Sequence, residues 1–494
     1  MPCTTLLVGK KASYDGTTMT ARNEDSGAGK FMPKKMVVVH PEQQPKTYRS
    51  VISHVTIPLP KNPMRYTAMP NANPNEGVWG AAGVNSANVS MTATETLTTN
   101  ERVLAADPMV RYQPAVGGKP EQAGGIGEED MVTLVLPYIR SAREGVLRLG
   151  SLLETYGTYE MNGIAFQDAD EIWWLETIGG HHWMAKRVPD DCYVVMPNQL
   201  GIDRFDMEDA LGEGKEHLCS PDLAEFVEEN HLDLSLDGVF NPRLAFGSHS
   251  DADHTYNTPR AWWIERYFNP RTNAWDGPDA DYRPDSDDIP WCRVPEAKIT
   301  PEDVKYVLSG HYQGTPYDPY AKHGDASLRG ALRPIGVNRN NFVSLVQISA
   351  EGPEETRAIE WIAYGSNVYN ALVPLFPWTD EIPAYFGNTG DLPSTESFYW
   401  ANRMIAALAD PHFARCASAL ERYQQKLQAE ARRVIQLAAR EAAKEEDRAK
   451  REALLSAANR EVEKLAREQT GKLLGDVLYE SSCGMKNAFA RSDA

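Results

Sequence analysis

The chain has 494 residues, 42% of them hydrophobic, and a formal net charge of −19. This composition can fill the core of one elaborated domain or of two domains, and the acidic balance argues against a nucleic-acid partner, because phosphate binding depends on clustered Lys and Arg. Six cysteines are scattered without a CxxC spacing, which is typical of reduced thiols rather than of a disulfide framework or a zinc site. The sequence contains neither a bilayer-spanning apolar run nor a secretory signal, so we expect no membrane partner and a cytoplasmic protein.

The first predicted element is a strand that begins at Cys3 and ends in a turn at Gly9. If Cys3 became the first residue, it would carry a nucleophilic sulfur together with an α-amino group whose pKa, about 7.7–8.0, suits a general base near neutral pH. The alternative is that Cys3 is a small buried hydrophobic residue, as most free cysteines are. The strand by itself leaves both interpretations open.

A second strand over residues 17–21 follows the turn Asp15-Gly16, and together the two strands predict a hairpin. The fold-back would bring Arg22 and Asp25 beside the start of the first strand. There a guanidinium would favour a thiolate, and a carboxylate would hold or orient a terminal ammonium. The alternative for both residues is an ordinary surface ion pair at a strand end.

The middle of the chain predicts a helix followed by a strand meander. Apolar residues recur at helical spacing over residues 131–156, with Pro137 near the first turn. Three meander strands are expected at residues 163–166, 171–176 and 182–185. The next strand, residues 193–196, ends just before Asn198, a position from which a rigid sheet can hold a polar side chain in register.

A Pro- and Asp-rich segment, residues 243–288, is predicted to form loops around one helix at residues 259–267. Its possible metal ligands are His249, Asp251, Asp253 and His254. They lie in a Gly- and Ser-rich loop without the helical spacing that aims two histidines at one ion, so we expect no metal. His311, further on, is a stronger site candidate, with a hydrogen-bonded structural histidine as the alternative.

From about Asp410 the composition shifts to Ala, Glu, Arg, Lys and Gln. Leu420, Leu427 and Val434 recur at a spacing of seven and predict an apolar seam, which breaks at Glu441. We therefore expect a catalytic domain over residues 1–405 and a helical C-terminal extension over residues 406–494, in which two helices fold back on their own chain or on a second subunit. A homo-oligomer formed through these helices is one alternative, and a helical layer on the same chain is the other.

Several motifs together resemble the dipeptidases of peptidase family C69, which also contains the secernins. The motifs are Cys3-Thr4-Thr5, Val8 to Ser13, Asp15-Gly16, Ala21 to Ser26, Gly83 to Thr96, Met196-Pro197-Asn198-Gln199 and His311-Tyr312-Gln313-Gly314-Thr315-Pro316-Tyr317-Asp318. The resemblance covers most of the first four hundred residues. It implies an α+β fold, the αββα sandwich of the N-terminal-nucleophile hydrolases, and the removal of the two residues before Cys3.

The resemblance also implies roles for individual residues. In the wider group that includes bile-salt hydrolases and penicillin V acylases, an Arg and an Asp spaced like Arg22 and Asp25 assist the cysteine, and an Asn that corresponds to Asn198 donates to the oxyanion. A second Arg belongs to that pattern, with Arg260 as the best match and Arg266 in reserve. An oxyanion-side Asn of those amidases falls near Glu95 here, so that role does not transfer, and an acidic group would instead suit a substrate with a free ammonium. His311 is assigned to substrate binding on the same basis.

The expected function is that of a cysteine-type dipeptidase, in which Cys3 attacks the scissile carbonyl of a dipeptide and a thioester forms and is hydrolysed. We expect no metal and no other cofactor. One alternative is an acylase that acts on a non-peptide amide. Another is an inactive secernin-like protein that interacts with partners through its helical tail.

Overall fold

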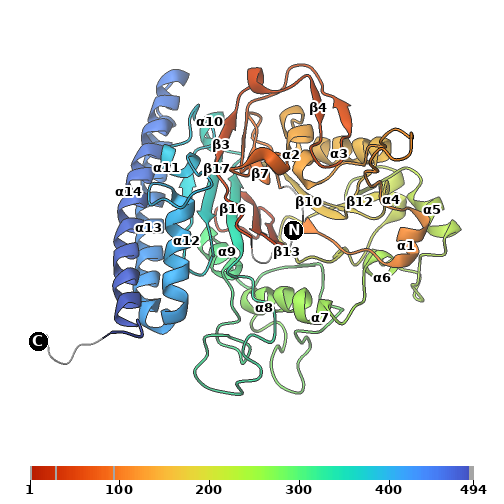
Figure 1. Ribbon diagram of the computed structural model, residues 1–494. Coiled ribbons are helices and arrows are strands. Elements are labelled where there is room, and N and C mark those ends of the chain that lie inside the picture. Colours follow the sequence, from red (N-terminus) through yellow and green to blue (C-terminus); the bar gives the residue numbers. More distant parts are fainter. Residues whose placement is uncertain (1–2, 28–29, 93–94, 489–494) are drawn as a thin grey trace, which may run out of the picture.

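The computed structural model describes residues 3–27, 30–92 and 95–488, which fold into helices and antiparallel sheets (Figure 1). The α+β class predicted from the sequence is confirmed. Two large sheets form the body, and a pair of long helices, α13 (Phe413–Ala442) and α14 (Arg448–Cys483), runs along one side of it. No helix in the described ranges combines the length and the apolar character needed to span a bilayer.

The first sheet contains the first strand of the chain and has the order β15-β13-β1-β2-β16-β17-β18, with all neighbours antiparallel. Its strands are β1 (Cys3–Val8), β2 (Thr18–Asp25), β13 (Tyr193–Met196), β15 (Cys292–Arg293), β16 (Asn340–Ile348), β17 (Ala358–Tyr364) and β18 (Val373–Leu375). The predicted hairpin is confirmed: in β1 and β2, Cys3 lies opposite Glu24 and Thr5 opposite Arg22. The Asp15 carboxylate accepts from the Thr17 backbone N–H at 3.2 Å and so fixes the turn that sets this register.

The second sheet has the order β14-β12-β11-β10-β8-β7, and β9 also pairs with β10. Its strands are β7 (Ala82–Val84), β8 (Ser90–Thr92), β9 (Glu95–Thr96), β10 (Asn162–Gln167), β11 (Ile172–Thr177), β12 (Trp183–Arg187) and β14 (His217–Cys219). The predicted meander is thus found as β10 to β12. Two small sheets pair β3 (Val37–Val39) with β6 (Tyr66–Ala68) and β4 (Thr47–Arg49) with β5 (Thr56–Pro58).

The two large sheets pack face to face, and side-chain alternation decides what each residue contacts. On β1, Leu7 joins Val194 of the same sheet and Trp174 of the second sheet in one buried cluster. Its neighbours Leu6 and Val8 instead join a cluster with helices α8 (Thr258–Phe268) and α9 (Pro301–Leu308). Because Cys3 is an even number of residues from Leu7, its side chain belongs to the face between the sheets.

Helices α2 (Glu128–Val135) and α3 (Ala142–Tyr156) pack on the outer face of the second sheet. The prediction of one helix over residues 131–156 was wrong, because the chain leaves the α-helix at a 3₁₀ turn around Pro137. A new helix begins at Ser141, whose hydroxyl accepts from the Glu144 N–H at 3.1 Å. Proline cannot donate to the preceding turn, and serine is a favourable N-cap, so the sequence favours two helices here.

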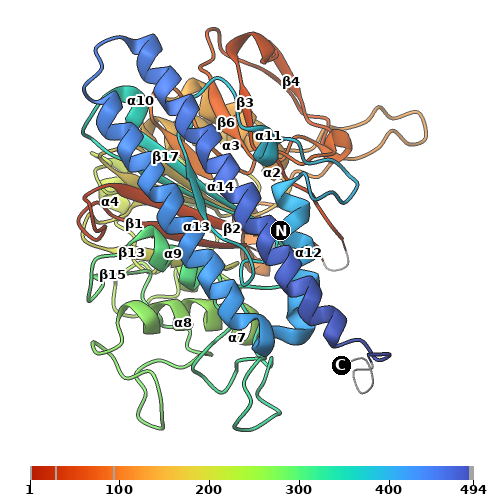
Figure 2. The ribbon, with the colours of Figure 1, turned by 90° about the vertical axis from the view of Figure 1, so that its left-hand side faces the viewer.

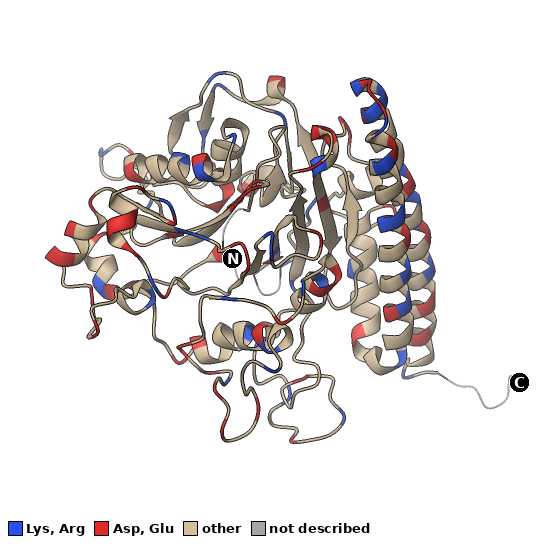
Figure 3. Cartoon of the chain, turned by 180° about the vertical axis from the view of Figure 1, so that it is seen from behind, with Lys and Arg blue, Asp and Glu red and all other residues tan. Residues whose placement is uncertain are grey.

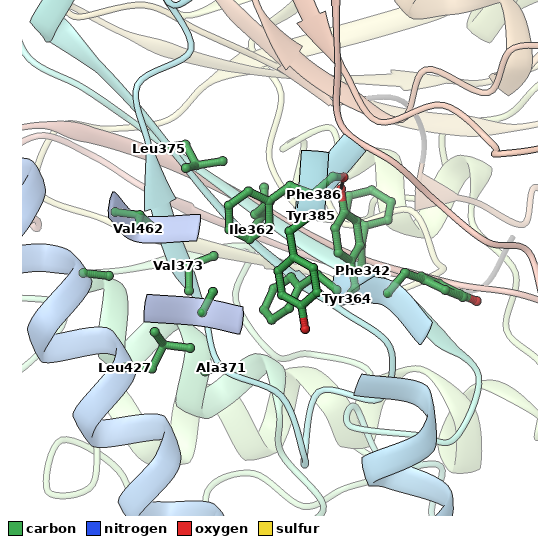
Figure 4. Close-up of a cluster of buried hydrophobic side chains, with 14 of the residues drawn as sticks. Phe342, Ile362, Tyr364, Ala371, Val373, Leu375, Tyr385, Phe386, Leu427 and Val462 are labelled. Atoms are coloured by element: carbon green, nitrogen blue, oxygen red, sulfur yellow. Dashed lines mark hydrogen bonds between the residues drawn. The ribbon is translucent and has the colours of Figure 1, made fainter. Parts of the chain in front are cut away.

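Helices α12 (Phe398–Ala409), α13 and α14 cover the end of the first sheet formed by β17 and β18 (Figure 2). Figure 4 shows Leu427 of α13 and Val462 of α14 beside Val373 and Leu375 of β18, all within one buried cluster. The two helices predicted from the sequence are therefore present, and the seam that includes Leu427 is covered by the same chain. Acidic and basic residues are interspersed along both helices (Figure 3). The predicted boundary between residues 405 and 406 falls within α12.

The remaining helices are short segments in the connections between the larger elements. They are α1 (Glu101–Ala106), α4 (Met207–Leu211), α5 (Leu223–Glu229), α6 (Pro242–Phe246), α7 (Asp253–Tyr256), α10 (Glu354–Arg357) and α11 (Ala384–Gly387).

Candidate active site

The Cys3 sulfur is buried at the start of β1, beside the guanidinium of Arg22. Arg22 Nη2 lies 3.0 Å from Cys3 Sγ and donates to Glu128 Oε1 at 2.6 Å, and Arg22 Nη1 donates to Glu24 Oε2 at 3.1 Å. All four side chains are buried. The hairpin register explains the contact, because Glu24 lies opposite Cys3 and Arg22, two residues away on β2, has its side chain on the same face.

Burial, rather than the neighbouring cation, dominates the titration of this thiol. Burial raises the pKa of Cys3 far above its ordinary value, Arg22 lowers it, and the carboxyl groups of Glu95 and Glu128 raise it further. The sequence-based expectation that Arg22 favours the thiolate is thus right in direction, but burial outweighs the effect. The sulfur is held as a neutral thiol, and it needs a base in contact with it before it can attack.

Asn198 and Arg260 approach the backbone of Cys3. Asn198 Oδ1 accepts from the Cys3 backbone nitrogen at 3.1 Å and from Arg260 Nη2 at 2.8 Å, while Asn198 Nδ2 donates to the Thr96 carbonyl at 2.9 Å. Arg260 Nη1 donates to the Cys3 carbonyl oxygen and, at 2.8 Å, to Thr4 Oγ1. Asn198 follows β13, the neighbour of β1, and Arg260 lies in the first turn of α8, so two separate elements converge on the same residue.

Glu95, at the start of β9, reaches the site from the second sheet. Its Oε2 accepts from Thr5 Oγ1 at 2.8 Å. Burial raises its pKa to about 8, although Arg260 and Arg22 lower it. Near neutral pH the carboxyl is therefore largely protonated, and it would ionise when a cation is placed against it.

Asp25 and Arg266 have other partners among the described residues. The Asp25 carboxylate accepts from Arg333 and Asn340. Arg266, the reserve for the second arginine, pairs with Asp276 at 2.7 Å on the surface. The geometry therefore favours Arg260 over Arg266 as the arginine beside Cys3. The role of Asp25 toward a terminal amine stays a prediction, because Met1 and Pro2 lie outside the described residues.

His311 lies apart from this group. Its Nδ1 is 2.9 Å from Asp318 Oδ1, and its ring makes edge contacts with Tyr320 and Phe413. It lines a cavity between α9 and α13 whose lining residues include none of the residues around Cys3. Its assignment to substrate binding finds no support in this position.

In the loop that holds the possible metal ligands His249 to His254, the Asp253 carboxylate accepts from Ser248 at 2.8 Å and also from Asn257. His254 pairs with Asp287 at 3.0 Å. Within the described ranges these side chains bind protein groups and form no cluster of metal ligands. We therefore find no geometric support for a metal here.

Sequence reasoning missed three members of the site. Glu24 lies between Arg22 and Lys34, whose Nζ is 3.0 Å from Glu24 Oε1, and Glu128 completes the network around Arg22. The spacing Arg22-x-Glu24 in a strand places both side chains on one face, a signal that could have revealed Glu24. For Glu128 the sequence shows only the acidic start of a helix, which is common at helix N-termini, so it carried no site signal.

The chain is similar to known peptidases along its whole length. Residues 2–426 match peptidase family C69. The chain is 56% identical over 532 residues to a dipeptidase of Bifidobacterium longum, covering all of both chains. It is 51% identical to a probable dipeptidase A of Streptococcus pyogenes, over 99% of this chain and 98% of the relative. It is also 41% identical to dipeptidase A of Lactobacillus helveticus, over 97% and 96% of the two chains.

The protein is a peptide hydrolase. More specifically, the chain belongs to peptidase family C69, as the resemblance in its motifs implied.

Proposed function

We propose that this protein is a cysteine-type dipeptidase of the N-terminal-nucleophile kind, located in the cytoplasm, with Cys3 as its nucleophile. The names of its relatives support the substrate class. Two antiparallel sheets packed face to face, with helices on both outer faces, fit the αββα sandwich of that group.

The contact between Arg22 and the Cys3 sulfur at 3.0 Å carries this proposal. On the backbone side, Asn198 Oδ1 lies 3.1 Å from the Cys3 nitrogen. If Met1 and Pro2 are removed, that nitrogen becomes an α-amine, and one residue then supplies nucleophile and base. A base is needed because burial keeps the thiol protonated.

In the proposed reaction the α-amine takes the thiol proton as the sulfur attacks the scissile carbonyl. Arg22 stabilises the negative charge that develops on sulfur, and Asn198 Nδ2 donates to the oxyanion. The C–N bond then breaks, and the α-ammonium returns the proton to the leaving amine. Water, deprotonated by the same amine, then attacks the thioester, the C–S bond breaks, and the ammonium returns the proton to the Cys3 sulfur. The carboxyl-terminal amino acid of the dipeptide is therefore released first, as the leaving amine, and the amino-terminal one is released after hydrolysis, as the free acid.

The polar groups around the sulfur support a substrate with a free ammonium. Glu95 and Glu128 are buried carboxyl groups within the electrostatic range of Cys3, and a cation beside them would offset the cost of their burial. An acylase acting on a non-peptide amide has no such requirement, so this feature favours a dipeptide. Arg260 donates to the Cys3 carbonyl oxygen. Asp25 stays the proposed partner of the α-ammonium that Cys3 itself would carry after removal of Met1 and Pro2.

The proposal is tested with paired substrates, namely a panel of dipeptides and the same dipeptides acetylated at the amino group. We expect hydrolysis of the free dipeptides and at least a hundredfold lower kcat/KM for the acetylated ones, because they lack the ammonium. Equal rates for both sets would favour the acylase alternative. No hydrolysis of any dipeptide by folded protein would favour the inactive interaction protein.

A further inference from the structure

The cavity lined by His311, of about 520 Å³, lies between α9, the segment after it and α13. Sites for small molecules typically enclose roughly 300–1,000 Å³. Its lining residues include His311, which the proposed reaction does not use, but none of the residues around Cys3. One wall is formed by α13, so the cavity lies where the C-terminal helices meet the body of the protein.

The cavity contains a buried lysine without a counter-charge. Lys305 is 5% exposed, and its Nζ donates to Ser309 Oγ at 2.7 Å and to the Asn367 carbonyl at 2.6 Å. Both partners are neutral, and no carboxylate of the described residues forms a salt bridge with it. Burial lowers its pKa to about 7. A protonated amine has three N–H groups, so an anion that enters the cavity could accept the third one and offset the buried charge.

The rest of the lining divides into an apolar wall and an acidic rim. Val368, Phe413 and Leu420 supply the apolar wall. Two of the three acidic groups are already paired: Glu302 with Arg432 at 2.7 Å, and Asp318 with His311 at 2.9 Å. Glu421, on the exposed side of α13, forms no ion pair within the described part of the chain. The cavity thus offers one cation, one apolar surface and one unpaired carboxylate.

We propose that this cavity binds a free α-amino acid with an apolar side chain, whose carboxylate pairs with Lys305 and whose ammonium lies toward Glu421. The apolar side chain packs on Phe413 and Leu420. This is a second site, separate from the Cys3 centre, and it does not depend on the catalytic mechanism. Because peptide hydrolysis releases amino acids, such a site would let the protein respond to its own products.

Isothermal titration calorimetry with two ligands tests the proposal. The first is L-leucine, and the second is isoamylamine, which has the same side chain and amine but lacks the carboxylate. We expect leucine to bind and isoamylamine to bind at least tenfold more weakly, because isoamylamine cannot accept the charge-assisted hydrogen bond from Lys305. Titrations at about pH 8 in two buffers of different ionisation enthalpy should show proton uptake, because Lys305 is largely neutral before binding. The other titratable groups that line the cavity are Glu302, Tyr306, His311, Asp318 and Glu421.

Two variants locate the site. Lys305→Met removes the cation without removing the aliphatic chain, and Ala417→Phe fills the cavity from α13. We expect both to weaken leucine binding at least tenfold and Lys305→Met to abolish the proton uptake. Lys322→Met, on an exposed loop, is the matched control and should bind leucine normally. Lys305→Met should keep the melting temperature of the unliganded protein, because the cost of burying an amine without a counter-charge disappears together with its two hydrogen bonds.

All titrations are repeated in Cys3→Ala protein, so that a failure of the catalytic proposal leaves this result unchanged. Leucine affinity that survives both Lys305→Met and Ala417→Phe would overturn the proposal and place the amino acid elsewhere, including at the Cys3 centre. Isoamylamine binding as tightly as leucine would overturn it as well, since the carboxylate would then contribute nothing.

Discussion

At the scale of single residues, the site combines a buried thiol with a buried network of opposite charges. Arg22 contacts the sulfur and two carboxylates at once, and Lys34 pairs with one of these carboxylates. Even so, burial raises the pKa of the thiol. A free cysteine in this setting is inert until a base reaches it, which ties its reactivity to the formation of an α-amine at the same residue.

The first prediction concerns the nucleophile. Cys3→Ala should abolish dipeptide hydrolysis, and Cys3→Ser should retain a small fraction of it, because an alcohol can use the same amine base but ionises less readily. Cys483→Ala, which changes an exposed cysteine, is the control and should keep full kcat. Steady-state assays check this, and a fully active Cys3→Ala protein would refute the assignment.

The second prediction separates the two roles of Arg22. Arg22→Gln should lower kcat by about a hundredfold or more, because the charge on sulfur loses its stabilising donor. It should also lower the free energy of unfolding by about 3–5 kcal/mol, because the buried carboxylates of Glu24 and Glu128 would lose the guanidinium that they share. Urea unfolding and kinetics measure both effects.

Arg22→Lys helps to separate the effect on rate from the effect on stability. It keeps the positive charge, so it should recover part of the free energy of unfolding but less of the kcat that Arg22→Gln loses. Arg266→Gln, at an exposed ion pair, should change neither quantity. An Arg22→Gln protein that unfolds more easily yet turns over at the normal rate would leave Arg22 with a structural role alone.

The third prediction concerns pH and Glu95. The pKa of Glu95 is raised by burial to about 8, so its carboxylate fraction grows as the pH rises from about 6 to about 7.5, where the substrate amine is still mainly protonated. KM for a dipeptide should therefore fall over this range. In Glu95→Gln, KM should be about tenfold higher and should not vary with pH. A variant that keeps the pH dependence of KM would show that another group recognises the ammonium.

Part of the site was predictable from the sequence. The family resemblance implied roles for Cys3, Arg22, Asn198 and Arg260, and the hairpin signal at Asp15-Gly16 brings Arg22 to the sulfur. Glu128 was not predictable, because its contact with Arg22 joins positions 106 residues apart, one at the start of a helix and the other on a strand of the first sheet. A single sequence has no local signal for such a contact.

At the scale of elements, alternation and turn residues predicted the hairpin and the meander, because period-two patterns and glycine turns are local properties. The break between α2 and α3 was missed although its causes are local too: Pro137 ends one helix and Ser141 caps the next. His311 illustrates the limit of a motif. Its ring packs against Phe413 of α13 and lines a cavity that none of the residues around Cys3 line, and the path of a loop depends on tertiary packing.

The fourth prediction tests how α13 is held on the body. Leu427 is fully buried against the first sheet and α14, so Leu427→Ala should lower the free energy of unfolding by about 2–5 kcal/mol. Leu437→Ala on the same helix changes a residue that is 47% exposed and should stay within about 0.5 kcal/mol of the parent. Equal small effects would mean that α13 packs weakly on its own chain and would favour a role between subunits.

At the scale of the whole molecule, the residues around Cys3 lie where the sheets and α8 meet, while the C-terminal helices cover the opposite end of the first sheet. The acidic composition and the two terminal helices were predictable, because charge and helical periodicity are read directly from the sequence. The way the helices share one hydrophobic cluster with β17 and β18 was not, because it depends on contacts between distant segments.

The intact mass of the active enzyme tests the central claim most directly. If Cys3 supplies both the nucleophile and the base, every active molecule begins at Cys3, and specific activity rises in proportion to the fraction of chains without Met1 and Pro2. We predict this proportionality across preparations that are processed to different extents. Full activity in a preparation whose chains all retain Met1 or Pro2 would contradict the account.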